Sequence, residues 1–163
     1  ARGASILAEV AGFSMTADAA DVVVPSQRGA ARAMAGAIAD AGLNADQVGY
    51  VNAHGTGTLA NDKIEIASLR DAFGQFSKQM AVSSTKSMHG HIMGGTGAIE
   101  LLSCIAAVKN GVLAPTINLQ SKDPMCDLDV IANTAREKPV SASISNAFAF
   151  GGLNAVIAIK RFN

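Results

Sequence analysis

The sequence has few aromatic residues and no net charge. Six Phe, one Tyr and no Trp make up its aromatic set, while 49% of its 163 residues are apolar and 16% are charged. This composition predicts a single α/β domain whose core consists of closely packed Ala, Val, Ile, Leu and Gly. The thirteen basic and thirteen acidic residues cancel without a run of one sign, so neither a nucleic-acid groove nor an anionic membrane surface is indicated.

Cysteines and long apolar runs are also scarce. Cys104 and Cys126 are too few for a disulfide framework and lack the paired spacing of a zinc site, which favours a reducing compartment, the cytoplasm. The apolar run at 4–10 is short and contains Glu9, so it predicts neither a signal peptide nor a membrane span. Because the chain begins without Met, we expect a fragment or a processed chain.

Apolar segments of strand and helix character alternate along the chain. The predicted strands are 5–13, 48–53, 80–82, 141–146 and 154–159, and the predicted helices are 29–40, 62–69 and 98–108. This order favours a mixed five-stranded sheet covered by helices, with its reactive loops at the carboxyl ends of the strands. The helix at 98–108 is apolar nearly all round, and we therefore expect it to be buried.

Three glycine-rich loops carry the chemistry of the sequence. The segment 82–100 holds two imidazoles, an ammonium, five hydroxyls and several glycines between a strand and a helix, and such loops usually carry function. His54 and the segment 148–152 also follow predicted strands, so all three loops can meet on one rim of the sheet. Taken alone, His54 is more simply a histidine that satisfies backbone groups in a tight turn.

Other patterns in these loops match known sites only weakly. His54, His89 and His91 lack the helical His-x-x-x-His spacing and the carboxylate of a metal site. The Ser-x-x-Lys pattern at 83–86 lacks its companion elements, and no Gly-Lys-Ser/Thr follows the glycines. Lys86 and Glu100 are either a surface pair worth little or, if buried together, a pair that sets the local field.

The two thiols do not look like activated nucleophiles. Cys104 lies among apolar residues of the 98–108 helix and is interpreted as core packing. Cys126 lies between Asp123 and Asp127, where a thiolate is disfavoured.

The three loops resemble a known family. The segments 51–58, 83–91 and 146–154 are similar to the signature loops of the carboxy-terminal half of β-ketoacyl-[acyl carrier protein] synthases, the type II elongating condensing enzymes of fatty-acid and polyketide synthesis. The resemblance runs from residue 1 to 162 and includes 118–119 and 123–129. It implies a thiolase-like fold, of which 1–163 is the carboxy-terminal ketosynthase domain. It also implies that the nucleophilic cysteine belongs to an amino-terminal half absent from this sequence.

The resemblance also implies roles for individual residues. His54 and His91 would stabilise an enolate oxygen as neutral N–H donors. Lys86, with Glu100 as its ion-pair partner, would contribute positioning and electrostatics rather than proton transfer. Phe150 would supply a backbone N–H to the oxyanion hole, and its ring would gate the acyl pocket. Thr56, Thr58, Phe148 and Gly151 would contact the phosphopantetheine arm or the acyl chain. No metal and no intrinsic cofactor is implied. The implied partners are acyl carrier protein, which carries the phosphopantetheine, and a second copy in a homodimer.

Three positions depart from the family pattern. His89 stands where Thr is common, Ala149 replaces a glycine of the Phe-Gly-Phe-Gly-Gly loop, and Val23 falls where many relatives have a hydroxyl. These departures bear on chain length, so a specialised enzyme for a nodulation signal or a polyketide is a second form of the same hypothesis. Two alternatives stay open, a non-catalytic chain-length-determining subunit and an isolated binding half-domain. For the isolated half we expect exposed apolar surface.

Overall fold

The computed structural model describes residues 2–162. Its strands are β1 (Glu9–Ala17), β2 (Val48–Asn52), β3 (Ala81–Ser83), β4 (Val112–Leu113), β5 (Asp129–Val130), β6 (Arg136–Glu137), β7 (Ala142–Ala149) and β8 (Leu153–Lys160). Its α-helices are α1 (Gln27–Asp40), α2 (Leu59–Phe73), α3 (Lys86–His89) and α4 (Thr96–Asn110). Short 3₁₀ turns occupy Ala45–Gln47, Gly74–Lys78 and Met93–Gly95.

The main sheet has six strands in the order β1-β8-β7-β2-β3-β5, and β4 and β6 form a separate pair. β8 runs antiparallel to both β1 and β7, whereas β7, β2, β3 and β5 pair in parallel. The strands β1, β7, β2 and β3 therefore share one direction, and their carboxyl ends lie at one edge of the sheet. That edge receives the loops on which the sequence motifs lie.

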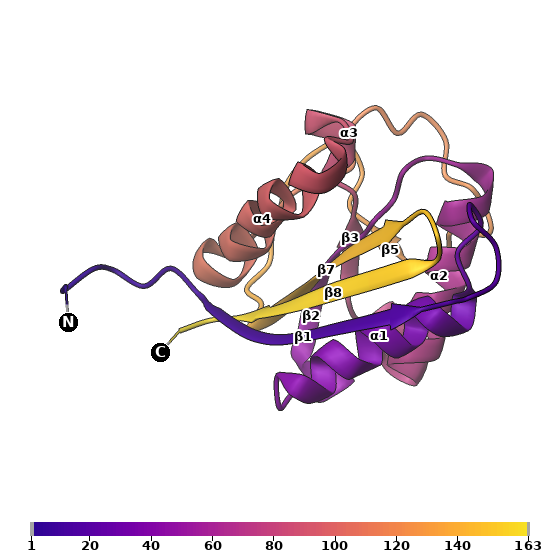
Figure 1. Cartoon of the computed structure of the whole chain (residues 1–163). Helices are drawn as coiled ribbons and strands as arrows, with labels where there is room; N and C mark the ends of the chain where they lie inside the picture. The colour runs from indigo at the N-terminus through magenta and orange to yellow at the C-terminus, as the bar shows by residue number, and fades with distance from the viewer. Residues whose placement is uncertain (1, 163) are drawn as a thin grey trace.

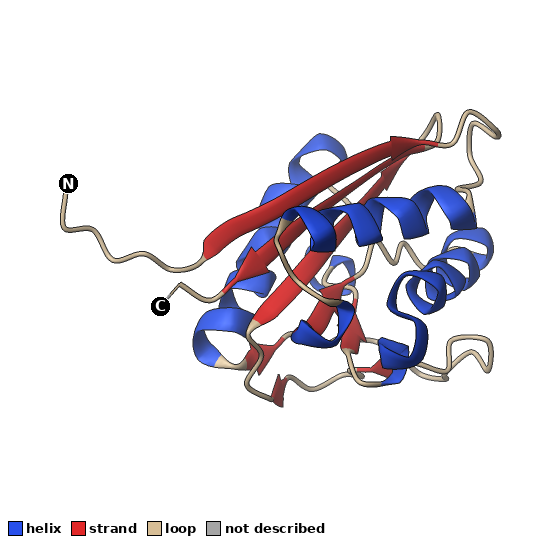
Figure 2. Cartoon of the chain, turned by 90° about the horizontal axis from the view of Figure 1, so that it is seen from below, coloured by secondary structure: helices blue, strands red, loops and turns tan. Residues whose placement is uncertain are grey.

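Helices cover both faces of the sheet (Figures 1 and 2). On one face α1 and α2 pack against the sheet around a core that includes Met34, Leu69 and Val156. On the other face α4 packs against β7 and β2, and Tyr50 and Cys104 belong to this second core. Small residues allow the close approach of α1 to β1, since a methyl at Gly12 would lie 2.4 Å from the carbonyl oxygen of Ala37.

The helix boundaries follow local sequence signals. Ser26 caps α1 and accepts a hydrogen bond from the backbone N–H of Gly29, which is the arrangement expected of an N-cap serine. Gly111 closes α4 at φ 68°, a conformation that glycine adopts without the steric cost of a side chain. The glycine terminator predicted for α4 and the serine cap predicted for α1 are both confirmed.

The predicted α/β class is confirmed, but two details of the sheet were wrong. The first strand is Glu9–Ala17 rather than 5–13, because its ladder follows β8, which pairs Glu9 with Lys160 and continues to Ala17 opposite Leu153. The sheet has six strands rather than five, because the two-residue β5 adds to the edge of β3. A strand this short, in a loop rich in Asp and Pro, has no hydrophobic periodicity to reveal it.

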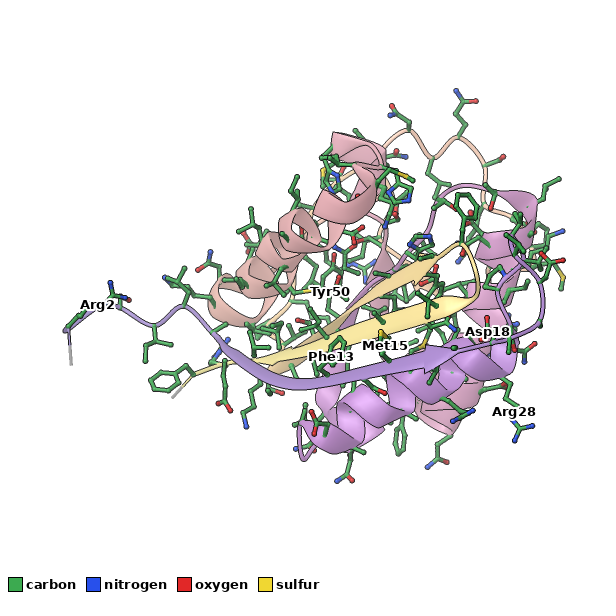
Figure 3. All side chains as sticks on the ribbon, viewed as in Figure 1. Arg2, Phe13, Met15, Asp18, Arg28 and Tyr50 are labelled. Atoms are coloured by element: carbon green, nitrogen blue, oxygen red, sulfur yellow. The ribbon has the colours of Figure 1, made fainter. Side chains whose placement is uncertain are left out.

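The prediction that the apolar helix at 98–108 is buried was also wrong for the chain as it stands. Leu102 of α4 is 64% exposed, because residues 2–162 place nothing against the outer side of the helix. Phe13 and Met15 are also exposed, on the face of β1 that points away from α1 (Figure 3). The apolar surface expected for this half is therefore present.

Candidate active site

His54 and His91 meet at the edge of the sheet where β2 and β3 end. Their ring centroids lie 5.5 Å apart in an edge-to-face arrangement with an interplanar angle of 85°. The Phe148 ring, at the end of β7, lies 5.3 Å from the His54 ring. The predicted meeting of the three loops is thus confirmed, since one residue from each loop contributes to this cluster.

The two histidines have different surroundings. His54 is buried, with 7% of its surface exposed, whereas His91 is exposed. Burial, and after it the positive charge of Lys86, lowers the pKa of His54 to about 3, so this ring is neutral at neutral pH. A neutral ring is able to donate one N–H. Nδ1 of His54 is buried without a hydrogen-bond partner among the described residues.

Glu65, which the sequence reading missed, holds the His54 loop from below. One carboxylate oxygen accepts the backbone N–H of His54 at 2.8 Å and the side-chain amide of Asn146 at 3.0 Å. The other accepts the backbone N–H of Gly55 at 2.8 Å and the side-chain amide of Asn61 at 3.4 Å. Burial raises the pKa of Glu65, while these donors favour the carboxylate. The loop is therefore anchored by a buried acid in the second turn of α2.

Lys86 and Glu100 form a buried ion pair, so the surface interpretation of this pair is wrong. Their side chains are 5% and 1% exposed. Lys86 begins α3 directly behind β3, and Glu100 lies in the second turn of α4, so the pair joins the His91 loop to the helix that follows it. Burial raises the pKa of Glu100, and the Lys86 ammonium opposes that rise. The Glu100 Oε2 atom has no hydrogen-bond partner within residues 2–162.

The third histidine, His89, lies apart from the ring cluster. Its Nδ1 is 2.7 Å from the carbonyl oxygen of Gly90, and its Nε2 is 3.1 Å from the hydroxyl of Thr85. Thr85 in turn contacts the side chain of Asn52 beneath the site. Within residues 2–162 no group of three His, Cys, Asp or Glu side chains is placed to hold a metal ion.

The segment 148–152 contains the last two residues of β7 and the turn at 150–152 that leads into β8. Phe148 is buried against His54, while Phe150 is 68% exposed at the tip. Gly151 and Gly152 have φ values of 82° and 75°, which glycine adopts readily. The Gly151 N–H donates to the carbonyl oxygen of Val22, so the turn is tied to the loop that follows β1.

Asp18, also missed by the sequence reading, is the centre of that tie. Its backbone N–H donates to the carbonyl oxygen of Gly152 at 2.8 Å. Its carboxylate accepts from the backbone N–H of Ser26 and from the side-chain amide of Asn154. Asp18 lies at the end of β1, at the same side of the molecule as the start of α1 (Figure 3). Two loops distant in sequence are thus joined into one hydrogen-bonded unit.

Thr56 and Thr58 lie on the loop between His54 and α2. Thr58 is the N-cap of α2 and accepts the backbone N–H of Asn61 at 3.2 Å, and the two threonine hydroxyls are 3.3 Å apart. A cavity of about 510 Å³ opens beside this loop. Its lining includes Thr56, Lys86 and His91 together with apolar side chains of α2 and β3.

Neither thiol is activated as a nucleophile, although the partly buried Cys126 is among the residues that line the cavity. Burial raises the pKa of the Cys104 thiol to about 12, and Cys104 is fully buried on the inner side of α4, which confirms its role in core packing. Burial and the nearby Asp123 carboxylate raise the pKa of Cys126. The thiolate form that a nucleophile requires is therefore disfavoured at both residues.

The sequence of the chain is similar to those of known proteins. The model of the family described as beta-ketoacyl synthase, C-terminal domain, matches residues 7–120. Nodulation protein E of Rhizobium leguminosarum bv. trifolii is 52% identical over 161 residues. The 3-oxoacyl-[acyl-carrier-protein] synthase 2 of Synechocystis sp. is 46% identical over 164 residues. The two alignments cover 99% of this chain and 40% and 39% of the respective relatives.

Solved structures share the same arrangement of elements. The ishigamide ketosynthase/chain length factor superposes with a TM-score of 0.95 at 40% identity. A type II PKS acyl-carrier protein in complex with its ketosynthase, AntDE:AntF, superposes with a TM-score of 0.95 at 31% identity. Each match covers 99% of this chain and 40% of the other chain.

The fold is thus the thiolase-like α/β fold that ketosynthases share. The chain belongs to the β-ketoacyl synthase family, to its C-terminal domain. It spans about two fifths of the length of the curated relatives it matches. None of the helices in the described part is long and apolar enough to cross a membrane.

Proposed function

We propose that this chain is the carboxy-terminal half of a 3-oxoacyl-[acyl carrier protein] synthase. The observation that carries the proposal is the edge-to-face contact of His54 and His91 beside the buried Lys86–Glu100 pair. Relatives named 3-oxoacyl-[acyl-carrier-protein] synthase 2 support the reaction class. The reaction is the decarboxylative condensation of malonyl-carrier protein with an acyl chain held as an enzyme thioester.

The two histidines would act on the charge that develops during decarboxylation. Breaking the bond to the carboxylate releases CO₂ and leaves its electron pair as an enolate, whose oxygen accepts N–H donors from His54 and His91. Such a donor is typically worth ~3 kcal/mol in the transition state. The low pKa of His54 supports this role, because it keeps the ring neutral at neutral pH, and a neutral imidazole can donate its single N–H to the enolate oxygen.

The carbon end of the enolate would then attack the acyl thioester. A carbon–carbon bond forms, the bond from the acyl carbon to the enzyme sulfur breaks, and the thiolate leaves. We assign the backbone N–H of Phe150 to the oxyanion of the tetrahedral intermediate and its exposed ring to the gate. Thr56, Thr58, Phe148 and Gly151 would contact the phosphopantetheine arm or the acyl chain.

The remaining parts of the enzyme lie outside residues 2–162. Cys104 and Cys126 are unsuited to carry the acyl chain, so the nucleophilic cysteine would come from an amino-terminal half. We propose acyl carrier protein as the partner, because a solved neighbour is a ketosynthase bound to one. We also propose a homodimer without an intrinsic cofactor. A cytoplasmic location is supported by the free thiols of the described chain.

A specialised acyl product is the sub-hypothesis that the relatives favour. The 52% identity to a nodulation protein E exceeds the 46% identity to the 3-oxoacyl synthase of Synechocystis sp.. The second candidate function is a non-catalytic chain-length-determining subunit, and the neighbour described as a ketosynthase/chain length factor supports it. The assembled His54, Lys86 and His91 argue for catalysis, because a purely structural partner has no use for enolate donors.

The test is malonyl-carrier decarboxylation by the full-length protein. We expect H54A and H91A each to lower the rate about 100-fold, as the loss of one ~3 kcal/mol donor requires. H89A is the matched control, because His89 lies two positions from His91 but contacts Thr85 instead of the ring cluster. This variant should keep most of the activity. A wild-type protein without decarboxylation, or variants with full activity, would favour the partner-subunit function.

A further inference from the structure

Thr96, the first residue of α4, contacts His91 from below. Its side chain is buried, with 3% of the residue surface exposed. The Thr96 hydroxyl oxygen lies 3.0 Å from Nδ1 of His91 and accepts the backbone N–H of Ile92 at 2.7 Å. The helix has no side-chain N-cap, because Gly95 occupies that position, so the hydroxyl is directed to the loop rather than to capping.

The direction of the hydrogen bond to His91 follows from the partners of this hydroxyl. A backbone N–H can only donate, so the contact with Ile92 uses a lone pair of the threonine oxygen. The hydroxyl proton then needs an acceptor. Among the hydrogen-bond contacts that residues 2–162 give Thr96 Oγ1, Nδ1 of His91 is the one atom able to accept it. The threonine therefore donates to Nδ1.

A neutral imidazole carries a single N–H, and the hydrogen bond at one nitrogen decides where that proton lies. With Nδ1 occupied as an acceptor, the proton of His91 is on Nε2. We propose that Thr96 is a positioning residue that fixes His91 as the Nε2–H tautomer and so makes it the N–H donor that the proposed condensation uses. This inference rests on the proposed function for its consequence, but the tautomer itself does not depend on it.

The tautomer is measured directly in the full-length protein with ¹⁵N-labelled histidine at pH 8. Long-range ¹H–¹⁵N correlation spectra distinguish a protonated ring nitrogen from a bare one, and H91A identifies the signals. We expect wild type and T96S to show Nε2 protonated and Nδ1 bare, and T96V to show a population with the proton on Nδ1. A wild-type ring protonated on Nδ1, or a T96V spectrum identical to that of wild type, would overturn the proposal.

Kinetics supply the second readout. We expect T96V to lower the kcat of decarboxylation about fivefold, the factor to which a hydrogen bond of ~1 kcal/mol corresponds, with little change in KM and with activity restored in T96S. T134V, the same change at an exposed threonine, should leave kcat unchanged. Equal losses in T96V and T96S would refute the role of the hydroxyl. If wild type does not decarboxylate at all, the proposed function fails while the spectra still decide the tautomer.

Discussion

The replacement of Glu65 by Gln tests how the chain holds the His54 loop. Each carboxylate oxygen accepts two N–H donors, and two of the four are the backbone N–H groups of His54 and Gly55. A glutamine amide keeps one acceptor oxygen and turns an NH₂ group toward two donors. Two hydrogen bonds to a charged acceptor are therefore lost, each worth about 1.5–3 kcal/mol.

The net effect is smaller than the sum of these losses, because the glutamine no longer buries a charge. We expect E65Q to lower the free energy of unfolding by about 3 kcal/mol, a large share of the 5–15 kcal/mol typical of a protein. Chemical unfolding followed by circular dichroism measures this change. Hydrogen exchange of a peptide spanning 53–58 measures the local effect, and we expect faster exchange at the His54 and Gly55 amides.

E137Q is the matched control, because Glu137 is exposed and the same change there should stay within about 0.5 kcal/mol of wild type. The reasoning is refuted if E65Q is as stable as E137Q and the two amides exchange as slowly as in wild type. It would then follow that the loop is held by its own turn geometry rather than by the buried carboxylate.

Three further predictions concern pH, backbone and charge. Burial lowers the pKa of His54 to about 3 in the folded protein, whereas a histidine in the unfolded chain has a pKa of about 6.5. The contribution of neutral His54 to stability is therefore complete above pH 6.5 and is lost as the pH falls. Between pH 7 and 5 the free energy of unfolding, measured by urea titration, should fall by about 2 kcal/mol more in wild type than in H54Q. G152A should destabilise more than G57A in thermal melts, since both glycines have φ 75° but only a methyl at Gly152 meets a neighbour, at 2.8 Å. K86M should lower the free energy of unfolding by about 3–5 kcal/mol, because it leaves the buried Glu100 unpaired. A K86M/E100Q double variant that is no more stable than K86M would contradict this.

The sequence predicted the meeting of the three loops for a topological reason. His54, His91 and Phe148 each follow a segment of strand character, and parallel strands bring their carboxyl ends to one edge of a sheet. Local signals were also sufficient for the Ser26 cap of α1 and the Gly111 end of α4, because a cap depends on residues within one turn. What could be predicted was thus either local or imposed by the direction of the strands.

Glu65 and Asp18 could not be predicted in this way. In the sequence, Glu65 is one acid of an amphipathic helix, and its burial depends on how α2 packs beneath a loop that precedes it. Asp18 lies in a polar stretch that favours a loop, and its partners Gly152 and Asn154 are more than 130 residues away. Hydrogen bonds between such distant positions have no periodicity, so only the assembled sheet reveals them.

The two histidines are held by separate devices, and this separation can be tested with a double-mutant cycle. Glu65 anchors the backbone of His54, whereas Thr96 binds the ring of His91, and the two supports share no hydrogen-bond partner. Their effects on stability should therefore add within about 0.5 kcal/mol in the double variant E65Q/T96V. Their effects on decarboxylation should combine to less than the product of the single losses, because both rings would serve one enolate oxygen and groups that act as a unit are not additive. Fully multiplicative losses of kcat would instead mean that the two supports contribute independently to the transition state rather than as a unit.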